Sequence, residues 1–204
     1  MNSEDFELEY HPFAPFVPEG ARVLFMGTFP PQPKRWAMEF YYPNRTNDFW
    51  PMMGLIFYGD RRALFAADGR SFDLERIKGM LTEHHIAMSD TGHAVRRLRN
   101  NASDKFLEIV EPVDLPGLLA RMPECRAIAT TGEKAAEVIA QLTGTEPPKM
   151  GARVEGPAGL SLWRMPSTSR AYPLALERKA DYYRELLRSE AILTKRAYMP
   201  DMPR

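Results

Sequence analysis

VLFMGTFP, residues 23–30, is the stretch of sequence that decides the fold. It begins with a continuous apolar run and ends at glycine and proline, which predicts a strand over residues 23–29 that is buried on both faces. A polar loop that is rich in proline follows and reaches the segment YYPNRTNDFW, residues 41–50. Because ligands bind at the carboxyl ends of strands in open α/β sheets, this loop is a candidate binding site.

A second loop of the same kind lies near the C-terminus. The apolar residues 160–163 predict another strand, and the polar segment MPSTSR, residues 165–170, follows it. If both strands belong to one parallel sheet, their carboxyl ends lie at the same edge. We therefore expect the two loops to face one cleft.

Between these loops, short apolar runs alternate with stretches of helical periodicity. This alternation predicts an α/β protein, a three-layer α/β/α sandwich with a central, mostly parallel sheet of about four strands. Residues 143–159 suit a loop or a short ribbon, since they contain clusters of glycine and proline. We expect strands at 23–29, 86–89, 127–131 and 160–165, and helices at 48–57, 72–83, 114–122, 132–140 and 173–189.

Length and composition limit the class of protein. The 204 residues suit a single domain, 1–204, with an irregular N-terminal arm at 1–20 and a C-terminal tail at 190–204. The 27 basic and 27 acidic residues balance, so any nucleic-acid site has to be a local patch. The single cysteine and the spacing of the four histidines suggest no metal site. We expect no cofactor and no membrane contact, and a cytoplasmic location; a monomer is the expected oligomeric state, which the sequence leaves open.

The two loops together resemble motifs of the uracil-DNA glycosylase superfamily. In that family the first strand ends in Gly-x-(Asp/Asn)-Pro and the last in (His/Asn)-Pro-Ser, where this chain has residues 27–30 and 165–167. The hypoxanthine-DNA glycosylase branch is the most similar, because its elements Tyr-Tyr-x-Asn-Pro-Arg-Asn-x-Phe-Trp and Pro-Ser-Thr-Ser resemble residues 41–50 and 166–169. The mismatch-specific branch has His-Pro-x-Asn-x-Phe-Trp, which resembles residues 43–50. The likeness spans residues 22–185. It implies a monofunctional DNA glycosylase of base excision repair that flips a deaminated base and removes it by hydrolysis.

The chain departs from the family at three positions. Phe29 and Met165 stand where the best-known uracil enzymes have an Asp or Asn that activates water and a His that stabilises the transition state. The proline that usually follows the motif asparagine is lost after Asn44. These changes leave an alternative open, which is a catalytically silent nucleic-acid or nucleotide-binding protein with the same fold.

Two residues are candidates for the chemistry. Asn47 can hold the attacking water through its side-chain carbonyl, although it can equally be a structural residue at the start of the helix beside Asp48. Asp90 follows a predicted strand, and an ionised carboxylate only accepts hydrogen bonds. It therefore suits the N–H edge of uracil or hypoxanthine, or it caps a turn.

The remaining candidates bind the extruded base and the DNA backbone. Flipped bases stack on aromatic side chains, so Phe40 and Tyr41 join Thr28 and Phe29 of the first motif as base-binding candidates. We expect the loop after the last strand to contact DNA phosphates through hydroxyls, backbone amides and one guanidinium. Its residues are Ser167, Thr168, Ser169 and Arg170. A basic cluster at Arg96, Arg97 and Arg99 is interpreted as a solvated face. DNA that contains a damaged or mismatched base is the expected partner.

Overall fold

The main sheet contains the four predicted strands in one parallel array. The computed structural model describes residues 6–98 and 106–193. The strand order is β3-β2-β6-β8-β7, and the fifth strand, β7, is an antiparallel edge strand formed inside the segment 143–159. The bounds are Val23–Gly27 for β2, Ile86–Asp90 for β3, Ala127–Thr130 for β6, Arg153–Glu155 for β7 and Ser161–Arg164 for β8.

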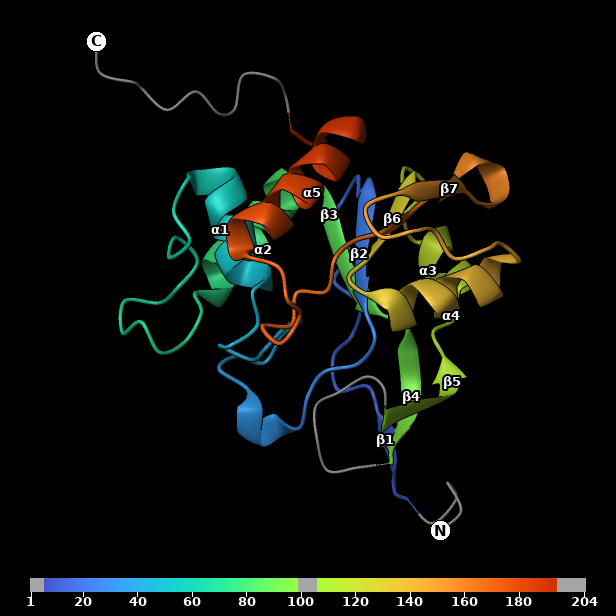
Figure 1. Cartoon of the computed structure of the whole chain (residues 1–204), viewed down its shortest axis with the longest axis horizontal. Coiled ribbons are helices and arrows are strands. Elements are labelled where there is room, and N and C mark those ends of the chain that lie inside the picture. The colour runs from blue at the N-terminus through green and yellow to red at the C-terminus, as the bar shows by residue number, and fades with distance from the viewer. Residues whose placement is uncertain (1–5, 99–105, 194–204) are drawn as a thin grey trace.

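Helices pack on both faces of this sheet (Figure 1). Successive side chains of a strand point to opposite faces, and β2 follows this rule. Val23 and Phe25 belong to one hydrophobic cluster, while Leu24 and Met26 belong to another. The first cluster includes residues of α1 (Phe49–Tyr58), α2 (Leu74–Glu83) and α5 (Leu176–Ser189), and the second includes residues of α3 (Leu115–Ala120) and α4 (Glu133–Thr143).

A second, antiparallel sheet was not predicted from the sequence. It has the order β1-β4-β5, with β1 at Leu8–Tyr10, β4 at Gly92–Arg97 and β5 at Leu107–Pro112. The arm at 1–20 is therefore not irregular throughout its described part. Because β4 begins two residues after β3 ends, this small sheet extends from the carboxyl edge of the main sheet (Figure 1).

The interpretation of the basic cluster as a solvated face was wrong for Arg97. Only 9% of its side chain is exposed, and its guanidinium binds Glu9 and the carbonyl oxygen of Pro30. Arg97 thus joins β1 to the loop after β2. Arg99 lies outside the described residues.

Smaller differences concern the ends of elements. The loop at 30–46 contains one 3₁₀ turn, η2 at Pro33–Arg35, and a second turn, η4, forms at Pro157–Gly159. Residues 194–204 of the expected tail lie outside the described part of the chain. Within the described ranges, no helix has the length and apolar character needed to cross a bilayer.

The connections between strands diverge at the carboxyl edge of the main sheet. From β2 the chain crosses to β3 on one side, and from β6 it crosses to β8 on the other side. Neighbouring strands whose connections diverge in this way form a topological switch point, where open α/β sheets bind ligands. The switch point here lies between the ends of β2 and β6, beside the loops at 27–30 and 165–167.

Candidate active site

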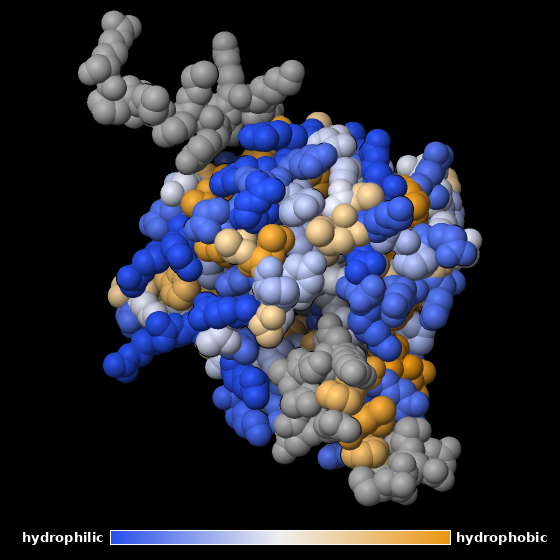
Figure 2. All heavy atoms as spheres, in the orientation of Figure 1, coloured by the Kyte–Doolittle hydropathy of each residue, from blue (hydrophilic) through white to orange (hydrophobic). Residues whose placement is uncertain are grey.

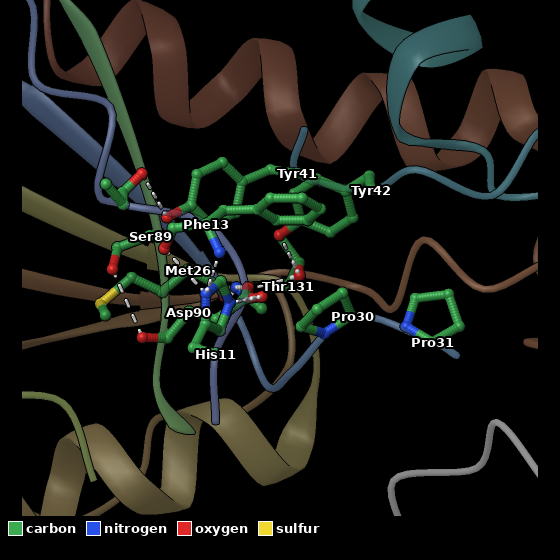
Figure 3. A network of polar contacts seen from close by, with 12 residues as sticks. His11, Phe13, Met26, Pro30, Pro31, Tyr41, Tyr42, Ser89, Asp90 and Thr131 are labelled. Carbon is green, nitrogen blue, oxygen red and sulfur yellow. Dashed lines mark hydrogen bonds and ion pairs between the residues drawn. The ribbon is translucent and has the colours of Figure 1, made fainter. Parts of the chain in front are cut away.

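Asp90, at the end of β3, is held in place by two donors. Its Oδ1 accepts a hydrogen bond of 3.1 Å from the backbone N–H of Gly27, and its Oδ2 lies 2.9 Å from Nε2 of His11 (Figure 3). The carboxylate is buried at the edge of the sheet where the predicted loops begin. A carboxylate has about four lone-pair positions, so these two contacts leave it able to accept a further donor.

Gly27 is required at the end of β2 because Asp90 and Tyr42 approach it closely. A Cβ at this position would lie 2.7 Å from Oδ1 of Asp90 and 3.2 Å from the hydroxyl oxygen of Tyr42. The first motif glycine therefore makes room for two polar groups that belong to other loops.

His11 is a site residue that the sequence reasoning missed. The carboxylate of Asp90 only accepts, so Nε2 of His11 donates to it. Nδ1 lies 2.9 Å from the carbonyl oxygen of Phe13 and 3.2 Å from the N–H of Phe13. A neutral ring accepts from that N–H, whereas a protonated ring donates to that carbonyl. The protonation state of His11 thus selects its contact with Phe13.

The side chains of Phe40 and Tyr41 are buried in the core and are not exposed at the carboxyl edge of the sheet. Both side chains belong to the large hydrophobic cluster, and the Tyr41 hydroxyl donates to the carbonyl oxygen of Ala14. Burial raises the pKa of Tyr41, and the nearby charge of Asp90 raises it further, so its hydroxyl stays protonated. This placement does not favour direct stacking of a base on either ring.

Tyr42 is the aromatic residue of this segment that reaches the switch point. Its hydroxyl lies 2.7 Å from Oγ1 of Thr131, just after β6, and its ring stacks on Phe49 at 4.0 Å (Figure 3). The φ angle of Tyr42 is 51°, in the left-handed region that bulky residues rarely occupy. Backbone strain of this kind concentrates at functional sites.

Phe29 and Thr28 directly follow β2, beside the switch point. Phe29 is half-buried, with its ring edge-on to His11 at 5.2 Å and the guanidinium of Arg97 at 5.5 Å from its centre. Thr28 is buried, and its carbonyl oxygen accepts from the N–H of Gly92. Phe29 is therefore placed by groups of the small sheet.

Asn47 has the structural contact that the sequence left as an alternative. Its side-chain oxygen accepts a 2.8 Å hydrogen bond from the N–H of Phe49 at the start of α1. A carbonyl oxygen has a second lone pair, and the side chain is half-buried, so Asn47 can still hold a water molecule. Asp48 takes the N-cap position of this helix, but its side chain makes no capping bond.

Asp48 instead forms a buried ion pair that joins the two loops. Its Oδ2 lies 2.8 Å from Nζ of Lys179, a fully buried residue of α5. The same ammonium donates to the carbonyl oxygen of Ser169 at 2.8 Å, and the N–H of Asp48 donates to the carbonyl oxygen of Thr168 at 2.9 Å. The loop before α1 and the loop after β8 are thus joined by direct contacts.

The predicted phosphate loop differs in exposure from residue to residue. The hydroxyl oxygens of Ser167 and Ser169 accept from backbone N–H groups two residues on, which leaves their O–H groups free to donate. Thr168 is buried, whereas 57% of the Arg170 side chain is exposed. Arg170 approaches Asp48 at 3.6 Å.

The side chain of Met165 supplies no polar group to the carboxyl edge of the sheet. Its side chain is buried, and its N–H donates to the carbonyl oxygen of Thr130 as part of the sheet. Among residues 6–98 and 106–193, no group of three or more histidine, cysteine or acidic side chains is arranged to hold a metal ion.

Comparison with known proteins supports the fold. No protein-family model and no curated protein matches the sequence. A solved structure is similar: the solution NMR structure of a "putative Uracil DNA glycosylase" from Methanosarcina acetivorans. It has a TM-score of 0.60 and 21% sequence identity, and the match covers 91% of this chain and 99% of that one. The two proteins share a fold.

We expect Lys179→Met to destabilise the protein strongly. It removes one partner of a buried pair and leaves the charge of Asp48 largely uncompensated, which costs about 3–5 kcal/mol. Urea unfolding measures the loss. The matched control is Arg178→Met, since Arg178 pairs with Asp181 at the surface and such pairs contribute about 0–1 kcal/mol. Equal stability of the two variants would contradict the role of the pair, and addition of Asp48→Asn should restore part of the loss.

We expect Gly27→Ala to destabilise the protein by about 1–3 kcal/mol, the usual cost of an atom forced into a packed site. The new methyl group has to displace the carboxylate of Asp90 from its two donors. Gly79→Ala in α2 is the control, because a Cβ there meets nothing within 4 Å and alanine favours a helix. In thermal unfolding, the melting temperature of Gly27→Ala should fall below that of wild type, and the melting temperature of Gly79→Ala should rise. A Gly27→Ala protein as stable as wild type would show that Asp90 moves freely.

Proposed function

We propose that this protein is a monofunctional DNA glycosylase of the uracil-DNA glycosylase superfamily, nearest to the hypoxanthine-DNA and mismatch-specific branches. Its substrate is DNA with uracil, hypoxanthine or a mismatched thymine, and its product is an abasic site for base excision repair. The proposal includes a three-layer α/β/α arrangement, a single domain, a cytoplasmic location and a monomer that needs no metal or cofactor.

One observation carries this proposal. The two motif loops lie at the same edge of the sheet and are tied together by the Asp48–Lys179 pair, beside the buried carboxylate of Asp90. The shared fold with the Methanosarcina acetivorans protein supports the same reading. Both motif loops therefore contribute to one crevice at the switch point.

The reaction requires few groups from the protein. Cleavage of the N-glycosidic bond builds positive charge on the sugar and negative charge on the departing base, and fixed dipoles and donors stabilise these charges. Water then adds to the sugar carbon, and its proton ends on solvent or on the released base. In this proposal Asn47 positions the water through its remaining lone pair, and Asp90, oriented by His11, accepts an N–H of the base.

The other site residues bind the substrate. Phe29 is the side chain that meets the flipped base, with Thr28 beside it and with Phe40 and Tyr41 as the packed support behind Tyr42. Ser167, Ser169 and Arg170 contact backbone phosphates through O–H and N–H donors, and Thr168 holds the loop in place through its backbone.

A second candidate function is a catalytically silent nucleic-acid or nucleotide-binding protein. It is favoured by the side chain of Met165, which is buried and apolar, and by the side chain of Phe29, which cannot hydrogen-bond. The crevice and the phosphate loop would serve binding equally well without catalysis.

We expect Asn47→Ala to slow single-turnover excision about a hundredfold or more, the scale of a lost charge-stabilising or positioning group. Labelled duplexes with single uracil, hypoxanthine or mismatched thymine, treated with alkali after incubation, measure excision. Asp90→Asn adds donors to an accepting group and should change which base is removed. The control is Gln141→Ala, since Gln141 is an exposed amide near the end of α4 and belongs to neither motif loop.

The outcomes separate the two functions. If wild-type protein binds DNA but excises none of these bases, the silent binder is correct. If excision survives Asn47→Ala but not Asp90→Ala, the water is held by Asp90 and not by Asn47.

A further inference from the structure

A surface pocket lined by four arginines lies beside the C-terminal loop. Its volume is about 170 Å³. The remaining lining residues are small or apolar, so the guanidinium groups are its only charges. The lining consists of Arg45, Arg61, Arg62, Arg170, Pro51, Phe65 and Gly69.

Three of these arginines have no acidic partner. Across residues 6–98 and 106–193, the structure gives an ion pair to Arg170 but none to Arg45, Arg61 or Arg62. Other arginines of the protein, such as Arg97 and Arg164, are paired with glutamates. Like charges gathered in one pocket repel one another, and a bound anion removes this cost.

The pocket is built into the fold by a defined turn. The side chain of Asp60 accepts from the N–H of Arg62, and the carbonyl oxygen of Asp60 accepts from the N–H of Ala63, which fixes the backbone that carries the arginines. Gly69 has a φ of +60°, and a Cβ there would lie 3.1 Å from Nη2 of Arg62. This glycine gives the Arg62 side chain its space.

The pocket includes residues of both loops that are proposed to bind DNA. Arg170 belongs to the loop after β8, and Arg45 belongs to the loop that carries Asn47 and Asp48. Pro51 lies in the first turn of α1. Figure 2 shows that the side of the molecule that carries α1, at the left of the view, is covered mainly by hydrophilic side chains. A strand that contacts Ser167 and Ser169 can therefore continue over this side.

We propose that this pocket binds backbone phosphodiesters of the same DNA strand that enters the crevice, on one flank of the flipped nucleotide. The inference rests on the proposed function and extends its phosphate contacts beyond the loop at 167–170. Guanidinium groups match phosphate oxygens in geometry and stay charged at every physiological pH. The apolar surfaces of Pro51 and Phe65 suit the adjoining sugar.

The test is DNA binding by the full chain with Arg61→Glu and Arg62→Glu combined. The probe is an undamaged, fluorescently labelled 20-base-pair duplex, titrated at several salt concentrations. We expect affinity at about 0.1 M salt to fall at least tenfold. The slope of log affinity against log salt should become shallower by about 1–2, since each neutralised phosphate contributes about 0.9. Both side chains are exposed, so the variant should fold, and thermal unfolding checks this.

Arg126→Glu is the matched control. Arg126 is exposed and lies at the opposite, amino-terminal edge of the sheet, directly before β6. Wild-type affinity and salt slope in the double variant would overturn the proposal. So would a control in which the single substitution lowers affinity by as much as each of the two substitutions in the double variant. A loss seen only with 5′-phosphorylated strands would also overturn it, because the pocket would then bind a terminal phosphate.

Excision by wild-type protein is scored separately. If wild-type protein excises no base while the double variant still loses affinity and salt slope, the glycosylase function fails and the phosphate pocket stands. If excision is found and the double variant binds like wild type, the pocket proposal alone fails.

Discussion

The buried pair between Asp48 and Lys179 is the interaction on which the arrangement of the crevice depends. Burial of an ammonium with no exposed surface is costly unless acceptors compensate its charge. Here the carboxylate of Asp48 and the carbonyl oxygen of Ser169 both accept hydrogen bonds from Lys179. Any other packing of α5 would leave one of the two charges buried without its partner. The loops before α1 and after β8 are 120 residues apart in sequence, and this contact holds them in one geometry.

The other side of the crevice is held by the small sheet. Because β4 follows β3 almost directly, pairing with β1 brings His11 to Asp90 and brings Arg97 to the loop after β2. Arg97 binds Pro30 of the first motif, and His11 binds Asp90, which in turn accepts a hydrogen bond from Gly27 of that motif. The main sheet therefore defines where the strand ends lie, while the antiparallel sheet orients the side chains at those ends.

The sequence predicted the parallel sheet well because its strands are short, continuous apolar runs. The runs at 23–27 and 127–130 are too short for buried helices and are typical of strands buried on both faces. The sequence did not reveal β1, β4 and β5, which are short, and the alternation of apolar and acidic residues at 6–10 was interpreted as part of an irregular arm because three prolines follow it. His11 and Lys179 were missed for a related reason. A histidine 79 residues from its partner leaves no local signal, and a lysine on a helix is expected at the surface. Exposure was equally hidden. Tyr41 and Tyr42 look alike in sequence, although Tyr41 is buried and Tyr42 is half-buried with its hydroxyl at Thr131.

The charges of the described site bear on the proposed excision, in which Phe29 and Met165 stand where the usual Asp and His would be. Its acidic group, Asp90, is buried beside the expected base, where an accepting carboxylate orients an N–H edge but disfavours negative charge on the leaving group. His11 offsets part of this, because its Nε2–H donates a hydrogen bond to the carboxylate. A base that leaves as a neutral, protonated species avoids the conflict altogether. Hypoxanthine can be protonated at its imidazole nitrogen, whereas uracil has no comparably basic ring nitrogen. Within the proposed function, the environment of Asp90 therefore suits a base that can leave in a protonated form.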